Sequence, residues 1–95
     1  MSARACPTAK FRLGHIVSTP NALQSLTSDD MLTAIARHQA GDWGDLDEKD
    51  RQANDQALVN GTRILSVYHA ANGKKFWLIT ESNRKVTTIL LPEDY

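Results

Sequence analysis

The sequence lacks most of the features that mark specialised classes of protein. Its 95 residues contain one cysteine, Cys6, which excludes a disulfide framework within the chain. No apolar run approaches the roughly 20 residues of a membrane-spanning helix. The first ten residues carry no hydrophobic stretch typical of a signal peptide. We therefore expect a cytoplasmic protein without membrane contact.

An excess of charge of one sign is also missing. Lys and Arg together number 11, as do Asp and Glu, so the formal net charge is zero. Nonspecific nucleic-acid binding depends on a basic excess, so nucleic acid is a disfavoured partner. Hydrophobic residues at 41% and charged residues at 23% are ordinary values for a globular protein. This length fits one domain, which we place at residues 11–95 after a disordered tail at residues 1–10.

The N-terminal half carries three helix starts. A hydroxyl cap before Pro20 predicts a short first helix. The stretch 27–30 predicts a second helix that ends at Gly41, and its core face is expected to hold Met31, Leu32, Ile35 and His38. A third helix is predicted from an Asp47 cap to just before Asn60, with Ala53, Ala57 and Leu58 as its apolar face.

The C-terminal third alternates with the period of two that is typical of strands. Asn72-Gly73 between apolar runs predicts a hairpin with a two-residue turn. That turn pairs Val67 with Leu78 and places Tyr68 directly opposite Trp77. A looser turn at residues 82–85 pairs Glu81 with Val86 and Ile79 with Thr88.

This register sorts the side chains onto two faces. The face expected to pack on helices holds Leu65, Val67, His69, Phe76, Leu78, Thr80, Thr87, Ile89 and Leu91. The predicted fold is α+β: two or three N-terminal helices on one face of a C-terminal three-stranded antiparallel sheet. Residues 11–17 are a candidate for an added N-terminal strand.

Several stretches carry a resemblance to a known family: 38–45, Asn54, 61–68, 77–81, Arg84 and 87–95. Together they are similar to short bacterial proteins from plasmids and integrated elements, which are labelled hypothetical, plasmid-related or type I restriction subunit. The resemblance covers about residues 11–95. A chain of this length cannot hold a methyltransferase fold with its cofactor site, so the resemblance implies a mobile-element setting and no activity.

The first functional hypothesis is a non-enzymatic interaction protein that binds a protein partner or a second copy of itself. Tyr68, Lys75, Trp77 and Thr88 share the second sheet face and are its candidate binding residues. The alternative is that another segment covers this face. Asp42 and Trp43 in the loop after the second helix are further binding candidates. His38, which is close in sequence to the carboxylates of Asp42 and Asp45, is either a general base or a structural histidine that closes the core.

The second hypothesis is a small endoribonuclease of the RelE/colicin-like toxin type, which joins N-terminal helices to an antiparallel sheet. Its catalytic candidates are His38, Arg84, Thr87 and Tyr95, with His as a base and Arg beside the developing phosphorane charge. This hypothesis rests on fold-level analogy. The sequence has no Gly-rich phosphate loop, no CxxC motif and no calcium-loop spacing, so no cofactor and no metal are expected.

Overall fold

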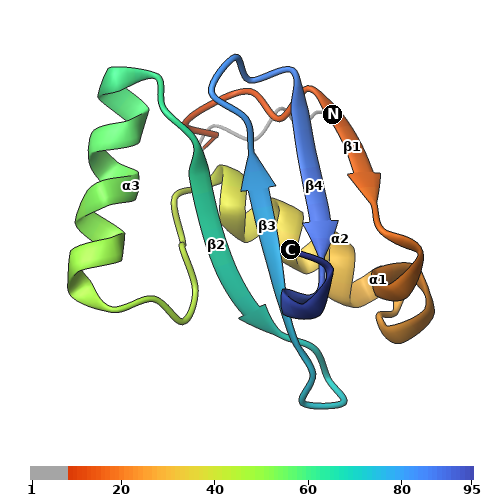
Figure 1. The fold of residues 1–95 in the computed structure, drawn as a ribbon. Coiled ribbons are helices and arrows are strands. Elements are labelled where there is room, and N and C mark those ends of the chain that lie inside the picture. The colour runs from red at the N-terminus through yellow and green to blue at the C-terminus, as the bar shows by residue number, and fades with distance from the viewer. Residues whose placement is uncertain (1–8) are drawn as a thin grey trace, which may run out of the picture.

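A four-stranded mixed sheet forms the centre of the molecule, and α1 and α2 lie on one of its faces (Figure 1). The structure is a computed structural model that describes residues 9–95. Its elements are β1 (His15–Ser18), α1 (Pro20–Ser25), α2 (Ser28–Gln39), α3 (Glu48–Asn60), β2 (Ile64–His69), β3 (Lys75–Thr80), β4 (Val86–Leu90) and η1 (Pro92–Asp94). The predicted α+β class is confirmed. Cys6 and most of the predicted tail lie outside the described residues.

The sheet differs from the predicted three-stranded antiparallel arrangement. β2, β3 and β4 form an antiparallel meander, and β1 adds to the other side of β4 in parallel, which gives the order β1-β4-β3-β2. The added N-terminal strand is real but spans His15–Ser18 rather than residues 11–17. Phe11 and Leu13 are drawn inward instead, because the Phe11 ring packs on His38 and Leu13 is buried.

Side-chain caps fix all three helix starts where the sequence predicts them. The Thr19 hydroxyl accepts a hydrogen bond from the Ala22 amide, and Pro20 opens α1. Thr27 and Asp30 form a reciprocal capping box at the start of α2. Asp47 caps α3. These starts are predictable because each cap involves residues only three positions apart.

The hairpin between β2 and β3 has a three-residue loop instead of the predicted two-residue turn. The Gly73 amide donates to the Ala70 carbonyl, and the Ala70 amide donates to the Lys74 carbonyl, both at 2.8 Å. Gly73 has a φ of +86°, whereas Asn72 does not enter the positive-φ region that a type I′ turn requires of both central residues. Gly73 is therefore the left-handed residue at the end of the turn formed by residues 70–73, and Ala71 and Asn72 are its central residues.

This extra loop residue shifts the register of β2 by one position. Val67 pairs with Trp77, and Tyr68 pairs with Phe76, so the predicted pairing of Tyr68 with Trp77 is wrong. Because side chains alternate along a strand, the shift turns all of β2 over. The β3–β4 register is as predicted, with Ile79 opposite Thr88.

The main core therefore draws on the opposite set of β2 side chains from the one predicted. It consists of Ala22, Leu26, Ala34, Tyr68, Ala70, Phe76, Leu78, Ile89 and Leu91. Ile64 packs in a second cluster with Trp43 and Ala57, between β2 and α3. His69, expected on the core face, is exposed.

Two of the predicted helix faces also need correction. Leu32 was expected on the core face of α2 but is exposed, while Ala34 takes a buried position. On α3, Ala53 is exposed and Asn54 is buried. α3 lies beside the sheet next to β2, rather than over a sheet face (Figure 1).

Candidate functional site

The predicted aromatic binding face is divided between two sides of the sheet. Lys75, Trp77 and Thr88 remain together on the sheet face opposite α1 and α2, whereas Tyr68 points into the core. Trp77 is half-buried, because the Tyr95 ring packs edge-on against it at 5.5 Å between centroids. The Tyr–Trp patch that motivated the first hypothesis is therefore absent.

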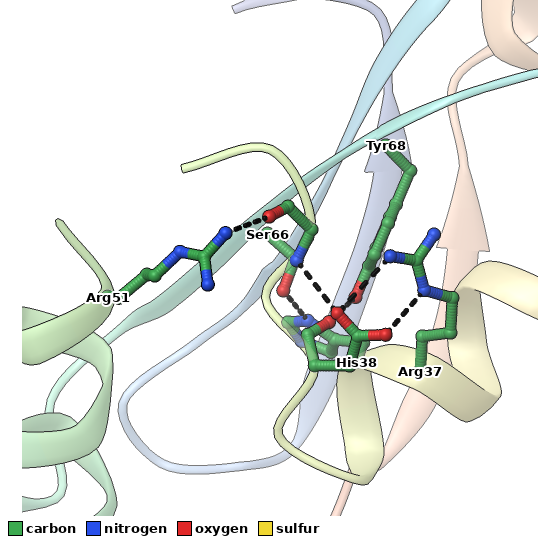
Figure 2. Close-up of polar contacts among 7 residues, drawn as sticks. Arg37, His38, Arg51, Ser66 and Tyr68 are labelled. Atoms are coloured by element: carbon green, nitrogen blue, oxygen red, sulfur yellow. Dashed lines mark hydrogen bonds and ion pairs between the residues drawn. The ribbon is translucent and has the colours of Figure 1, made fainter. Parts of the chain in front are cut away.

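Tyr68, Asp42 and Arg37 together anchor the loop that follows α2. The Tyr68 hydroxyl donates to the Asp42 carbonyl oxygen at 2.6 Å, and Arg37 lies over the Tyr68 ring at 4.7 Å. Figure 2 shows Arg37 reaching toward this loop from one side and Arg51 from the other. Hydrogen bonds from Arg37 hold the pKa of the Asp42 carboxyl below its usual range. Asp42 thus has a structural role here.

The neighbouring loop residues, Trp43 and Gly44, also have structural roles. Trp43 is buried, and its indole N–H donates to Asp55 on α3 at 3.1 Å. Gly44 bridges to Val67 of β2, with a φ of +79°. A Cβ at this position would lie 1.9 Å from the Val67 carbonyl oxygen, so only glycine allows the loop to approach the strand.

His38 sits in the middle of a buried chain of hydroxyl groups. Its Nδ1 lies 2.5 Å from Ser66 Oγ, and its Nε2 lies 2.8 Å from Thr80 Oγ1. Thr80 contacts Thr87 at 2.8 Å, and the Thr87 hydroxyl donates to the Leu13 carbonyl. The chain thereby joins α2 to β2, β3, β4 and the segment before β1.

The last acceptor in this chain fixes the direction of every bond. The Thr87 hydroxyl donates its hydrogen to the Leu13 carbonyl, so its oxygen accepts the hydrogen bond from the Thr80 hydroxyl. Because the Thr80 hydroxyl donates to Thr87, its oxygen accepts from His38 Nε2–H. Nδ1 is then the acceptor for Ser66. Burial, assisted by the charge of Arg84, lowers the pKa of His38 to about 4, which keeps the ring neutral.

The four ribonuclease candidates do not meet at an accessible surface. His38 and Thr87 have no exposed area. Arg84 donates to the carbonyl oxygens of Thr62, Glu81 and Ala57, which occupies its guanidinium near the C-terminal end of α3. Tyr95 is exposed and packs against Trp77.

The two edges of the sheet differ in whether other parts of the chain bond to their outer backbone groups. On β2, the Asn54 side chain both donates to the Leu65 carbonyl at 2.6 Å and accepts from the Leu65 amide at 3.2 Å. Two positions on, Val67 exchanges hydrogen bonds with the backbone of Trp43 and Asp45. The chain's own atoms therefore occupy this edge, which limits pairing with another strand.

The opposite edge, formed by β1, is open in the described residues. The amides of His15 and Thr19 donate to the β4 side, to Lys85 and Ile89. Because backbone polar groups alternate in direction along a strand, those of Ile16 and Ser18 point away from the sheet. β1 lies at the outer margin of the sheet in Figure 1, with no other described element beyond it.

Exposed apolar side chains surround this open edge. Ile16 and Val17 are each 45% exposed, Leu23 on α1 is 58% exposed and Leu32 on α2 is 64% exposed. An open groove of 430 Å³ between β1, α1 and α2 is lined by the side chains of Ile16, Leu23 and Leu32 and by the strand at Val17, together with Met31, Ile35 and Ile89. None of the described residues that line it carries a charged side chain.

Four of the six large hydrophobic residues that the described chain exposes border this groove. Single exposed apolar side chains are common, but a contiguous group beside unpaired strand backbone is typical of an interaction surface. The groove can bind an extended segment, with backbone hydrogen bonds to β1 and apolar contacts to the two helices. We call Ile16, Val17, Leu23 and Leu32, together with the outer backbone of β1, the edge site.

Sequence reasoning missed the edge site. The exposure of Leu32 depends on which side of α2 meets the sheet, and the openness of β1 depends on which strand it joins. A local signal was present nonetheless: Ile16 and Val17 form a short apolar strand that lacks the lysine or proline with which many edge strands are protected.

Within residues 9–95, no group of three or more His, Cys, Asp or Glu side chains is arranged to hold a metal ion. The helices of this part of the chain are too short or too polar to cross a membrane. Comparison with family models, curated proteins and solved structures finds no match for this chain.

Proposed function

We propose that this chain is a non-enzymatic interaction protein that binds an extended segment of a protein partner at the edge site. The observation that carries the proposal is the coincidence of an open strand edge with most of the large apolar side chains that the described residues expose. The contrast with β2 supports it, because the same chain occupies the backbone of that edge with Asn54 and the 43–45 loop.

The setting that we propose is a bacterial plasmid or integrated element, in which the chain is an accessory factor in the cytoplasm. This part of the proposal rests on the sequence resemblance alone. The ribonuclease alternative has less support, because two of its four candidate residues are buried and a third is bound to backbone carbonyls. Growth arrest on expression, relieved by Arg84→Ala in a variant that still folds, would favour that alternative instead.

Site-specific photo-crosslinking in cells tests the proposed surface. A photoreactive amino acid at Leu32 should give discrete crosslinked species, because this side chain borders the groove. The matched control is the same substitution at Val59, which is the more exposed position of the two and lies on α3, away from the groove. Crosslinking at neither position, or equally at both, would contradict the proposal.

A further inference from the structure

We infer that the partner at the edge site is a second copy of this chain, joined through antiparallel pairing of two β1 strands about a two-fold axis. This inference rests on the proposed function, because it names the occupant of the same surface. The pairing would join two four-stranded sheets into one continuous sheet, with α1 and α2 of both copies on the same face.

The backbone of β1 is complementary to itself in one register. Its outward-facing residues are Ile16 and Ser18, on either side of Val17. With the two-fold axis at Val17, Ile16 of each copy lies opposite Ser18 of the other. Each such pair exchanges two N–H···O=C bonds, so four hydrogen bonds form with no bulge or insertion.

The side chains around the edge suit this symmetry. A two-fold axis brings each surface group close to its equivalent, so a charged patch would meet like charge across it. The described residues that line the groove are uncharged, and the chain as a whole has a formal net charge of zero. A charged segment would find no complementary charge among these residues, whereas an uncharged edge can pair with its own copy without repulsion.

The strand pair alone is too small for a stable interface, since specific interfaces bury more than about 1,000 Å² in total. Leu23 and Leu32 extend the contact on the helical face, next to Ile16. The Val17 side chain lies on the sheet face opposite α1 and α2 and would meet Val17 of the second copy there. The dimer therefore requires the helical leucines as well as the strand.

The proposed register places the two Val17 residues directly opposite each other across the two-fold axis. Residues opposite each other at a non-hydrogen-bonded antiparallel position have Cα atoms about 4.5 Å apart, within the range of a disulfide. In a Cys6→Ser background, a Val17→Cys variant should form a covalent dimer under mild oxidation. The matched control Val59→Cys, at a more exposed position, should do so at least roughly tenfold more slowly.

Sedimentation equilibrium of the unmodified chain provides the second readout. We expect a concentration-dependent monomer–dimer equilibrium across the micromolar range, weakened at least roughly tenfold by Leu32→Glu and unchanged by Val59→Glu. Equal rates of disulfide formation at positions 17 and 59, or a chain that stays monomeric, would overturn the inference.

The two proposals fail in different ways. A monomeric chain whose Leu32 position crosslinks to another protein would overturn the dimer and leave the edge site as a docking surface. A monomeric chain without crosslinks at Leu32 would overturn both. A dimer that Leu32→Glu and Val59→Glu weaken equally would place the interface elsewhere and also overturn the inference.

Discussion

At the scale of single residues, the polar groups that suggested chemistry are mostly used to hold the fold together. His38 bonds to Ser66 and Thr80 in the interior, and Asp42 pairs with Arg37 at 2.7 Å. His38 and Asp42 lie close together in the sequence, but their roles depend on burial by elements that are distant along the chain. The sequence predicts a structural histidine as one alternative for His38. It does not predict that the partners of His38 are Ser66 on β2 and Thr80 on β3.

The neutral state of His38 predicts a specific pH dependence of stability. Burial lowers the pKa of His38 from 6.5 to about 4. Between these values the unfolded chain takes up a proton that the folded chain does not, so stability present above pH 6.5 is lost as the pH falls toward 4. The free energy of unfolding should drop by about 3 kcal/mol over this window from this group alone.

Denaturant unfolding of the wild type and of His38→Gln between pH 4 and pH 7 would measure this contribution. The variant should be less stable at pH 7 and should lack this part of the pH dependence, while the exposed-site control His69→Gln should retain it. The same slope in the wild type and in His38→Gln would contradict the assignment.

Gly44 gives a second prediction at this scale. Its added Cβ would overlap the Val67 carbonyl oxygen at 1.9 Å, whereas an added Cβ at Gly61 meets no atom within 4 Å. Both glycines have positive φ, at +79° and +73°, so the backbone strain of Ala is similar at the two positions. Gly44→Ala should lower the free energy of unfolding by about 2 kcal/mol more than Gly61→Ala, measured by chemical denaturation. Equal losses would show that the loop does not need its close approach to β2.

At the scale of elements, predictions succeeded where the determining contacts are local. Helix starts at Thr27 and Asp47 follow from caps within one turn, and the turn at residues 82–85 gives the correct β3–β4 register. The β2–β3 register failed because a glycine after asparagine suits two loop types that differ by one residue. The Ala71 backbone amide donates to the Asp30 carboxylate on α2, and the Asn72 side-chain amide donates to the Ser25 carbonyl. Both contacts support the observed loop, and neither is visible from the hairpin sequence.

Asn54 provides the test at this scale, because its side chain takes the place of a neighbouring strand at the β2 edge. Replacing it with leucine removes both hydrogen bonds to Leu65 and leaves the partly buried backbone groups there without these partners. We expect a loss of about 1–3 kcal/mol in the free energy of unfolding, measured by thermal or chemical denaturation. Gln56→Leu, at an exposed position on the same helix, is the matched control and should have little effect. An equally small effect of Asn54→Leu would mean that the β2 edge does not need this cover.

At the scale of the whole molecule, the fold leaves its two sheet edges in opposite states. The loop after α2 and the helix α3 lie along β2 and occupy its outer backbone, through residues 43–45 and Asn54. β1 reaches the other edge by joining β4, and among the described elements the short α1 and α2 border the groove beside it. This asymmetry could not be predicted from the sequence, because it follows from the strand order. It is the basis of the proposed interaction surface.

Amide hydrogen exchange at β1 measures whether the outer edge of this strand is open and whether a second copy occupies it. Ile16 and Ser18 direct their amides away from the sheet, whereas Val17 directs its amide toward β4. At low protein concentration, Val17 should exchange slowly and its two neighbours fast. At high concentration, the Ile16 and Ser18 amides should become protected as the edge is occupied. Fast exchange of both amides at every concentration would contradict the dimer, and protection that does not change with concentration would contradict the open edge of β1.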